Sequence, residues 1–275
     1  MADAVSVHPL AVVEPGAELG AGVSVGPFCT VSAGARLGPG TRLVSHVAIL
    51  GDTTLGSRCT VYPTAVLGAP PQNFKHEGGR SALVIGDDCT IREGVTVHAG
   101  TDTSRALTSI GDRCFLMANS HVAHDCALGN DVTMANYAGL GGHVEIGDHV
   151  IVSGYAAVHQ FVRIGHHAFL AGLAMVVGDV IPYGMAAGDR AVLRGFNLVG
   201  LKRSGMTRSE LTRMRQAYRA LFARDRPLAE AIAAVRAEHG DFAPVRDMLD
   251  FIGDRQRRYL TVPAAAGAAA DDDAA

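Results

Sequence analysis

Four histidines near the middle of the chain are the residues best suited to chemistry. They are His121, His124, His143 and His159, two close together and two following at wider, similar intervals. Imidazole titrates near neutral pH, so it can take a proton from a hydroxyl group as that group attacks. Three imidazoles can also bind zinc. Either chemistry requires a fold that brings these side chains together.

A six-residue repeat indicates that fold. Every sixth residue from Val7 to Leu67 is aliphatic, and the same pattern runs from Ile110 to Val176. The position four residues later holds small or β-branched residues, including all five cysteines, which we expect to pack in the core. This period is typical of a prism of short parallel strands with three hexads per coil, in which equivalent positions of successive coils stack at about 4.8 Å.

The repeat places the histidines at one edge of the prism. One inward column takes one residue from each successive coil, namely Val122, Leu140, Val158 and Val176. Each of the four histidines lies within three positions of this column and outside its inward position, so they span about 10 Å along the axis. Gly142 follows His124 by one full coil of three hexads and is expected directly above it.

Three kinds of site could use this cluster. A zinc site needs three or four converging ligands, and the sequence shows no carboxylate or glutamine arrangement like that of the zinc-binding β-helix carbonic anhydrases. A purely structural cluster is the second alternative. We favour general-base catalysis without a metal, because imidazole titrates near neutral pH and can take a proton from a hydroxyl as it attacks.

Two interruptions of the repeat and a change of pattern divide the chain. Residues 68–84 and 98–109 break the register and are predicted to be loops. After Val180 the pattern becomes helical, with a capping box from Thr207 to Glu210. We therefore expect a β-helix over 1–190, a helical domain over 191–260 and a disordered tail over 261–275, which is rich in alanine and aspartate.

Composition excludes several classes of protein. The net charge of −3 makes the whole molecule a poor binder of nucleic acid. We find no stretch suited to membrane insertion and no signal peptide at the start of the sequence. Five cysteines without a CxxC pair are typical of a reduced, cytoplasmic protein.

Several motifs resemble one enzyme family, the UDP-N-acetylglucosamine O-acyltransferases that begin lipid A biosynthesis. The match covers about residues 5–258 and is carried by the strings HVAHDC from His121, GH at Gly142, AVHQF around His159 and NLVGLKR from Asn197. The resemblance implies a left-handed parallel β-helix of hexapeptide repeats with a small C-terminal α-helical domain. It also implies a homotrimer with clefts between protomers. No cofactor is implied beyond the phosphopantetheine arm of acyl carrier protein.

The same resemblance assigns roles to individual residues. It implies that His124 is the base that deprotonates the sugar 3-hydroxyl and that the backbone N–H of Gly142 forms the oxyanion hole. It implies that Gly172 sets the length of the acyl chain. The implied substrate-binding residues are Asn73, Lys75, His121, His143, His159, Gln160, Asn197 and Arg203. We do not assign a His–Asp dyad, because Asp125 could point elsewhere.

The partners and the exact acceptor follow from further features. Residues 190–226 carry ten Arg or Lys against two acids, a surface suited to acidic acyl carrier protein. The family commonly has Asp where this chain has Asn73, so N-acylation of a 3-amino sugar stays an alternative to O-acylation. A second is the related UDP-3-O-acylglucosamine N-acyltransferase, which typically carries an extra N-terminal domain, whereas hexads here begin at Val7. An acetyl-CoA-dependent acetyltransferase and a non-catalytic β-helix scaffold are further alternatives.

Overall fold

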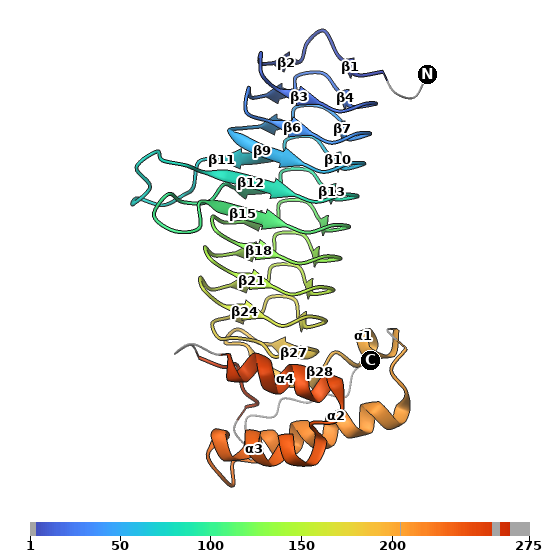
Figure 1. Cartoon of the computed structure of the whole chain (residues 1–275), viewed down its shortest axis with the longest axis vertical. Helices are drawn as coiled ribbons and strands as arrows, with labels where there is room; N and C mark the ends of the chain where they lie inside the picture. Colours follow the sequence, from blue (N-terminus) through green and yellow to red (C-terminus); the bar gives the residue numbers. More distant parts are fainter. Residues whose placement is uncertain (1–3, 204, 255–258, 265–275) are drawn as a thin grey trace.

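The computed structural model describes residues 4–203, 205–254 and 259–264. Its main body is a three-sided prism of short strands, with the N-terminus at one end and four helices at the other (Figure 1). The chain passes in turn through three sheets, which we call A, B and C. All strand pairs are parallel except the last, between β27 and β28.

Each sheet takes every third strand of the prism. Sheet A contains β1 (Ser6–Val7), β4 (Ser24–Val25), β7 (Arg42–Leu43), β10 (Thr60–Val61), β13 (Thr90–Ile91), β16 (Phe115–Leu116), β19 (Thr133–Met134), β22 (Ile151–Val152), β25 (Phe169–Leu170), β27 (Gly184–Ala187) and β28 (Val192–Phe196). Sheet B contains β2 (Val12–Val13), β5 (Thr30–Val31), β8 (Ala48–Ile49), β11 (Val66–Ala69), β14 (Thr96–His98), β17 (His121–Val122), β20 (Gly139–Leu140), β23 (Ala157–Val158) and β26 (Met175–Val176). Sheet C contains β3 (Glu18–Leu19), β6 (Arg36–Leu37), β9 (Asp52–Leu55), β12 (Ala82–Ile85), β15 (Leu107–Ile110), β18 (Ala127–Leu128), β21 (Glu145–Ile146) and β24 (Arg163–Ile164).

The predicted stacking of three hexads per coil is confirmed in sheet B. Val122 pairs with Leu140, Leu140 with Val158, and Val158 with Val176. Where the loops are inserted, the pairing still holds at a longer separation, as between Val97 and Val122. The aliphatic column therefore continues through both interruptions.

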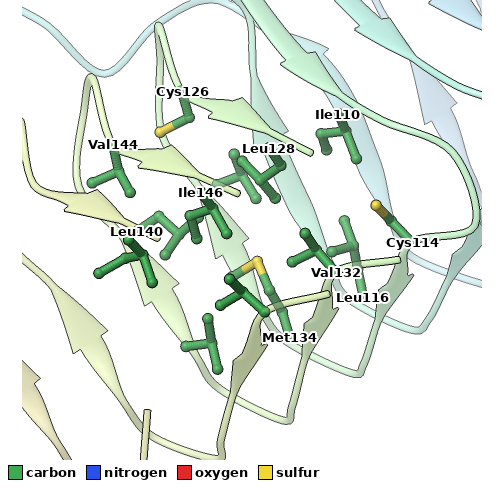
Figure 2. Packing of buried hydrophobic residues seen from close by; sticks show 14 of the residues in the cluster. Ile110, Cys114, Leu116, Cys126, Leu128, Val132, Met134, Leu140, Val144 and Ile146 are labelled. Carbon is green, nitrogen blue, oxygen red and sulfur yellow. The ribbon is translucent and has the colours of Figure 1, made fainter. Parts of the chain in front are cut away.

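The interior of the prism is filled by the aliphatic position and closed at its corners by the small one. Leu116, Met134, Leu140 and Val152 are almost completely buried, and Figure 2 shows such side chains in successive layers. Burial of one such side chain contributes about 2 kcal/mol. All five cysteines are buried and unpaired, which confirms that they pack in the core.

Both inserted loops leave the prism at one corner, where the chain passes from sheet B to sheet C. We call this edge the B–C corner. Strands β11 and β12 leave residues 70–81 for the first loop, and β14 and β15 leave residues 99–106 for the second. Both are shorter than the predicted 68–84 and 98–109, because β9, β12 and β15 pair along their whole lengths. The loops lie side by side in Figure 1.

The C-terminal part differs from the prediction at both of its boundaries. Strand β28 continues sheet A beyond residue 190, so the helices begin only at Leu198. They are α1 (Leu198–Arg203), α2 (Arg208–Leu221), α3 (Leu228–His239) and α4 (Ala243–Gly253). The predicted capping box starts α2. No helix in the described ranges has the length and apolarity needed to cross a bilayer.

The predicted disordered tail begins too early. Thr261 is buried, and its N–H and hydroxyl donate to the carbonyls of Asp179 and Gly178. Bridges from Leu260 to Asp179 and from Pro263 to Leu193 hold residues 260–263 against the end of the prism. The amino-acid composition of this segment does not predict these contacts. The rest of the predicted tail, residues 265–275, lies outside the described residues.

Candidate active site

A cavity of about 380 Å³ lies at the B–C corner, at the level of β17, β20 and β23. Its lining residues are Gln72, His98, His121, Ala123, His124, Gly141, Gly142, Val158, His159 and Gln160. Three of the four predicted histidines and Gln160 therefore share one cavity. The fourth, His143, packs beside it, with its ring centroid 5.1 Å from that of His124.

His124 lies against the backbone of Gly142, as the register predicted. The backbone carbonyl of His124 accepts a hydrogen bond from His143 N–H, which links the two coils. A Cβ atom placed on Gly142 would lie 2.6 Å from Cε1 and 2.8 Å from Nε2 of His124. Among the hydrogen bonds between described residues, none uses the Gly142 N–H. That amide is available to a ligand beside the imidazole.

Asp125 orients His124, although the sequence analysis did not assign it this role. Asp125 is fully buried, and its Oδ2 lies 2.8 Å from Nδ1 of His124. It also accepts hydrogen bonds from the N–H and hydroxyl of Thr101 in the second loop. A carboxylate only accepts hydrogen bonds, so Nδ1 of His124 carries a proton and Nε2 is left as the basic nitrogen.

The neighbouring histidines are held by their own partners. Nδ1 of His121 lies 2.8 Å from the hydroxyl of Thr96, and Nδ1 of His159 donates to the carbonyl of Gln160. Burial lowers the pKa of His121 below its usual value, and the charges of nearby histidines act in the same direction. His121 is therefore a neutral hydrogen-bonding group at pH 7.

Comparison with known proteins identifies the family. A family model described as UDP-N-acetylglucosamine O-acyltransferase, domain 2, matches residues 179–260, and one for bacterial transferase hexapeptide repeats matches residues 107–142. The acyl-(acyl-carrier-protein)–UDP-N-acetylglucosamine O-acyltransferase of Mesorhizobium japonicum is 54% identical over 267 residues, covering 97% of this chain and 96% of that protein. The protein of the same name from Brucella ovis is 54% identical over 269 residues, covering 97% of both chains. The chain belongs to this acyltransferase family.

Solved structures of UDP-N-acetylglucosamine acyltransferases agree with this assignment. LpxA from Acinetobacter baumannii has a TM-score of 0.89 at 34% identity, covering 92% of this chain and 99% of that one. The enzyme from Campylobacter jejuni has a TM-score of 0.87 at 37% identity, covering 94% and 100%. The expected left-handed parallel β-helix with a helical C-terminal part is thereby confirmed.

The residues assigned from the acyltransferase family do not all reach the cavity of one chain. Asn73 and Lys75 follow Gln72, a lining residue, in the first loop. Gly172 is exposed at the corner between sheets A and B, which we call the A–B corner. Asn197 donates to the carbonyl of His167 and accepts from Gly200 N–H, so it caps α1. Arg203 is exposed in the last turn of α1, away from the cavity lining.

Five lining residues were not among the predicted site residues, namely Gln72, His98, Ala123, Gly141 and Val158. His98 had a usable signal, because it directly follows the inward Val97, as His159 follows Val158. The second loop lengthens the step from Val97 to Val122 beyond three hexads, and counting by whole coils misses the relation. Nδ1 of His98 donates to the carbonyl of Pro70, so this histidine also supports the first loop.

The zinc alternative can be tested against the geometry. Ligand atoms of His124, Asp125 and His143 lie within 4.8 Å of one another, so these three could chelate a metal. However, the Asp125 carboxylate is already bonded to Thr101 and to Nδ1 of His124. That arrangement is typical of an oriented base, since it fixes the tautomer of the imidazole.

Proposed function

We propose that this protein transfers a 3-hydroxyacyl group from acyl carrier protein to the 3-hydroxyl of UDP-N-acetylglucosamine, the first step of lipid A biosynthesis. The observation that carries the proposal is the His124–Asp125 pair lying against Gly142, whose N–H makes no hydrogen bond to another described residue. Relatives at 54% identity are named for O-acylation, so the N-acyltransferase alternatives are not favoured.

The arrangement supports direct transfer by general-base catalysis. Nε2 of His124 takes the proton of the 3-hydroxyl while the sugar oxygen attacks the thioester carbon, because a free alkoxide would form too rarely. The carbonyl oxygen gains negative charge, which the Gly142 N–H stabilises. Collapse of this intermediate breaks the C–S bond, and the imidazolium returns its proton to the leaving thiolate. No covalent enzyme intermediate is required.

Residues that lie far from the cavity in one chain support a trimer in our proposal. Gly172 lies at the A–B corner, so it can reach an acyl chain at a B–C corner only from a neighbouring protomer. The A–B corner also exposes Tyr137, Tyr155 and Leu173 in three successive coils, and the two tyrosine rings stack at 4.9 Å. An exposed apolar stripe favours a subunit interface. Packing of A–B corners on B–C corners can close into a three-membered ring.

The carrier protein would dock on the helical domain. Lys202, Arg208 and Arg215 line a hollow of about 450 Å³ at α1 and α2, together with Met206, Leu211 and Thr212. These cations suit an acidic partner, since complementary charge speeds its encounter with the enzyme. We place the protein in the cytoplasm in this proposal, because its five free cysteines suit a reducing compartment.

One assay tests the function. Purified protein is incubated with UDP-N-acetylglucosamine or its 3-amino analogue and a series of 3-hydroxyacyl carrier proteins of different chain lengths. We expect transfer to the 3-hydroxyl, and we expect His124→Ala to lower kcat/KM by about 10³-fold with the fold intact. His149→Ala, at a different corner of the prism, is the control and should keep the wild-type rate. A near-normal rate for His124→Ala would disprove the proposal that His124 is the general base.

A further inference from the structure

A half-buried hydrogen-bonded contact between two side chains joins the two inserted loops. Nδ1 of His76 in the first loop lies 2.9 Å from Oδ1 of Asp102 in the second, and the two side chains are only 11% and 18% exposed. Oδ2 of Asp102 accepts hydrogen bonds from the N–H groups of Gly79 and Glu77. The Asp102 carboxylate thus holds both side-chain and backbone groups of the first loop.

The packing around Asp102 leaves little room for movement. A Cβ atom on Gly79 would lie 2.7 Å from both Cβ and Oδ2 of Asp102, so the loops meet closely only because residue 79 is glycine. The N–H of Gly79 is the main cause that lowers the pKa of Asp102. The carboxylate is therefore charged at neutral pH and accepts its hydrogen bonds in the stronger, charge-assisted form.

Asp102 directly follows Thr101, which holds Asp125 at the active site. Thr101 is fully buried, and its N–H and hydroxyl both donate to Asp125, the partner of His124. The N–H groups of Ser104 and Ala106 donate back to the Thr101 carbonyl, so the loop closes on itself around this residue. Thr101 thus contacts Asp125 of the His124–Asp125 pair, and the next residue, Asp102, contacts the first loop.

His76 also anchors the segment that carries Asn73 and Lys75. The Asn73 side-chain oxygen accepts from Lys75 N–H, and the Asn73 carbonyl accepts from His76 N–H. These bonds close a tight turn over residues 73–76. Because Lys75 itself is exposed, the position of its backbone depends on the anchor at the end of this turn.

We propose that residues 99–106 form a two-sided positioning element. Through His76, Asp102 positions the turn of Asn73 and Lys75 to receive the sugar nucleotide, while Thr101 positions Asp125 and so His124. The inference rests on the proposed function, because the roles of sugar binding and proton transfer are defined by it. Neither Asp102 nor His76 lines the cavity, so both are positioning residues.

Substitutions at Asp102 and at Thr101 should affect different kinetic constants. Asp102→Asn and His76→Ala release the first loop, so KM for the sugar nucleotide should rise about tenfold while kcat changes little. Thr101→Val keeps the shape but removes the hydroxyl that donates to Asp125. This change should lower kcat about tenfold and leave KM for the sugar nucleotide unchanged.

The experiment compares these variants with matched controls in steady-state kinetics. His76→Asn keeps a polar group near the position of Nδ1 and should reverse much of the rise in KM caused by His76→Ala. Asp52→Asn removes a surface carboxylate paired with Arg36 on the N-terminal half of the prism and should leave both constants unchanged. Wild-type KM in Asp102→Asn, or one shared pattern for Asp102→Asn and Thr101→Val, would overturn the proposal.

Hydrogen exchange gives a readout that does not depend on turnover. In Asp102→Asn, amides of residues 77–79 should exchange faster than in the wild type, whereas those of 159–162 should not change. Unchanged exchange at 77–79 would also overturn the proposal. If the wild type does not acylate UDP-N-acetylglucosamine, the proposed function fails, and the exchange result still decides whether Asp102 holds the loop.

Discussion

Replacing Gly142 by alanine tests the contact on which the proposed mechanism depends. The added Cβ would lie 2.6 Å from Cε1 of His124, whereas ordinary van der Waals contact begins at 3.4 Å. The imidazole must therefore move by several tenths of an ångström. Gly142 has no positive φ angle, so alanine introduces no backbone strain of its own. Alanine also keeps the backbone N–H, so any change in kcat reports the position of the His124 imidazole.

A displacement of this size has a predictable kinetic effect. Misplacement of a catalytic group by about 1 Å lowers the rate about 10²-fold, which corresponds to about 2.7 kcal/mol of transition-state stabilisation. We expect kcat for acyl transfer to fall by this amount, while the melting temperature stays close to that of the wild type. The assay follows transfer from 3-hydroxyacyl carrier protein to UDP-N-acetylglucosamine under saturating conditions.

The matched control is Gly139→Ala in the same coil, on strand β20. A Cβ atom at Gly139 meets no other atom within 4 Å, so this variant should keep the wild-type rate. Wild-type kcat in Gly142→Ala would refute the reasoning, because His124 could then act without lying against residue 142. An equal loss in both variants would show that the effect comes from the coil and not from the imidazole.

Three further predictions follow from the buried polar groups. Asp125→Asn should lower kcat at least about 10²-fold, because a neutral amide stabilises the imidazolium that forms on His124 far less than the carboxylate does. The melting temperature should fall as the pH is lowered from 7 to 5. Burial lowers the pKa of His121, His166 and His167 in the folded state. The unfolded chain therefore binds more protons than the folded chain over this pH range, so stability rises with pH. A flat melting profile over this range would contradict that reasoning. Burial raises the pKa of Cys126 to about 12, so a thiol reagent at pH 8 should label this residue only after denaturation, as peptide mass spectrometry can show.

The fold could be predicted from the sequence because its rule is local. An aliphatic residue at every sixth position must face the interior, and three hexads close one coil, so equivalent positions stack wherever the count is unbroken. Val122, Leu140 and Val158 follow this rule, and their pairing is as predicted. Helix α2 is equally local, since its capping box joins Thr207 to Glu210 within one turn.

Where the inserted loops interrupt the hexad repeat, the sequence predicted site residues and strand boundaries less well. His98 belongs to the same column as the predicted histidines, but the second loop separates it from the next coil by more than three hexads. The boundaries of both loops also moved, because pairing between β12 and β15 extends the strands into them. Residues 260–263 return to the prism through contacts with Asp179 and Leu193, which precede the whole helical part of the chain.

The amino-acid sequence by itself determined that the imidazole of His124 lies against Gly142, since stacking of coils depends only on the spacing of inward residues. Only the tertiary structure decided how that imidazole is oriented. Asp125 is fully buried at the corner, where its carboxylate accepts a hydrogen bond from the hydroxyl of Thr101. Thr101 lies in an inserted loop whose path is set by contacts with His76 and Gly79 of the other loop. Contacts between two loops outside the repeat have no period to count, so they appear only when the chain is folded.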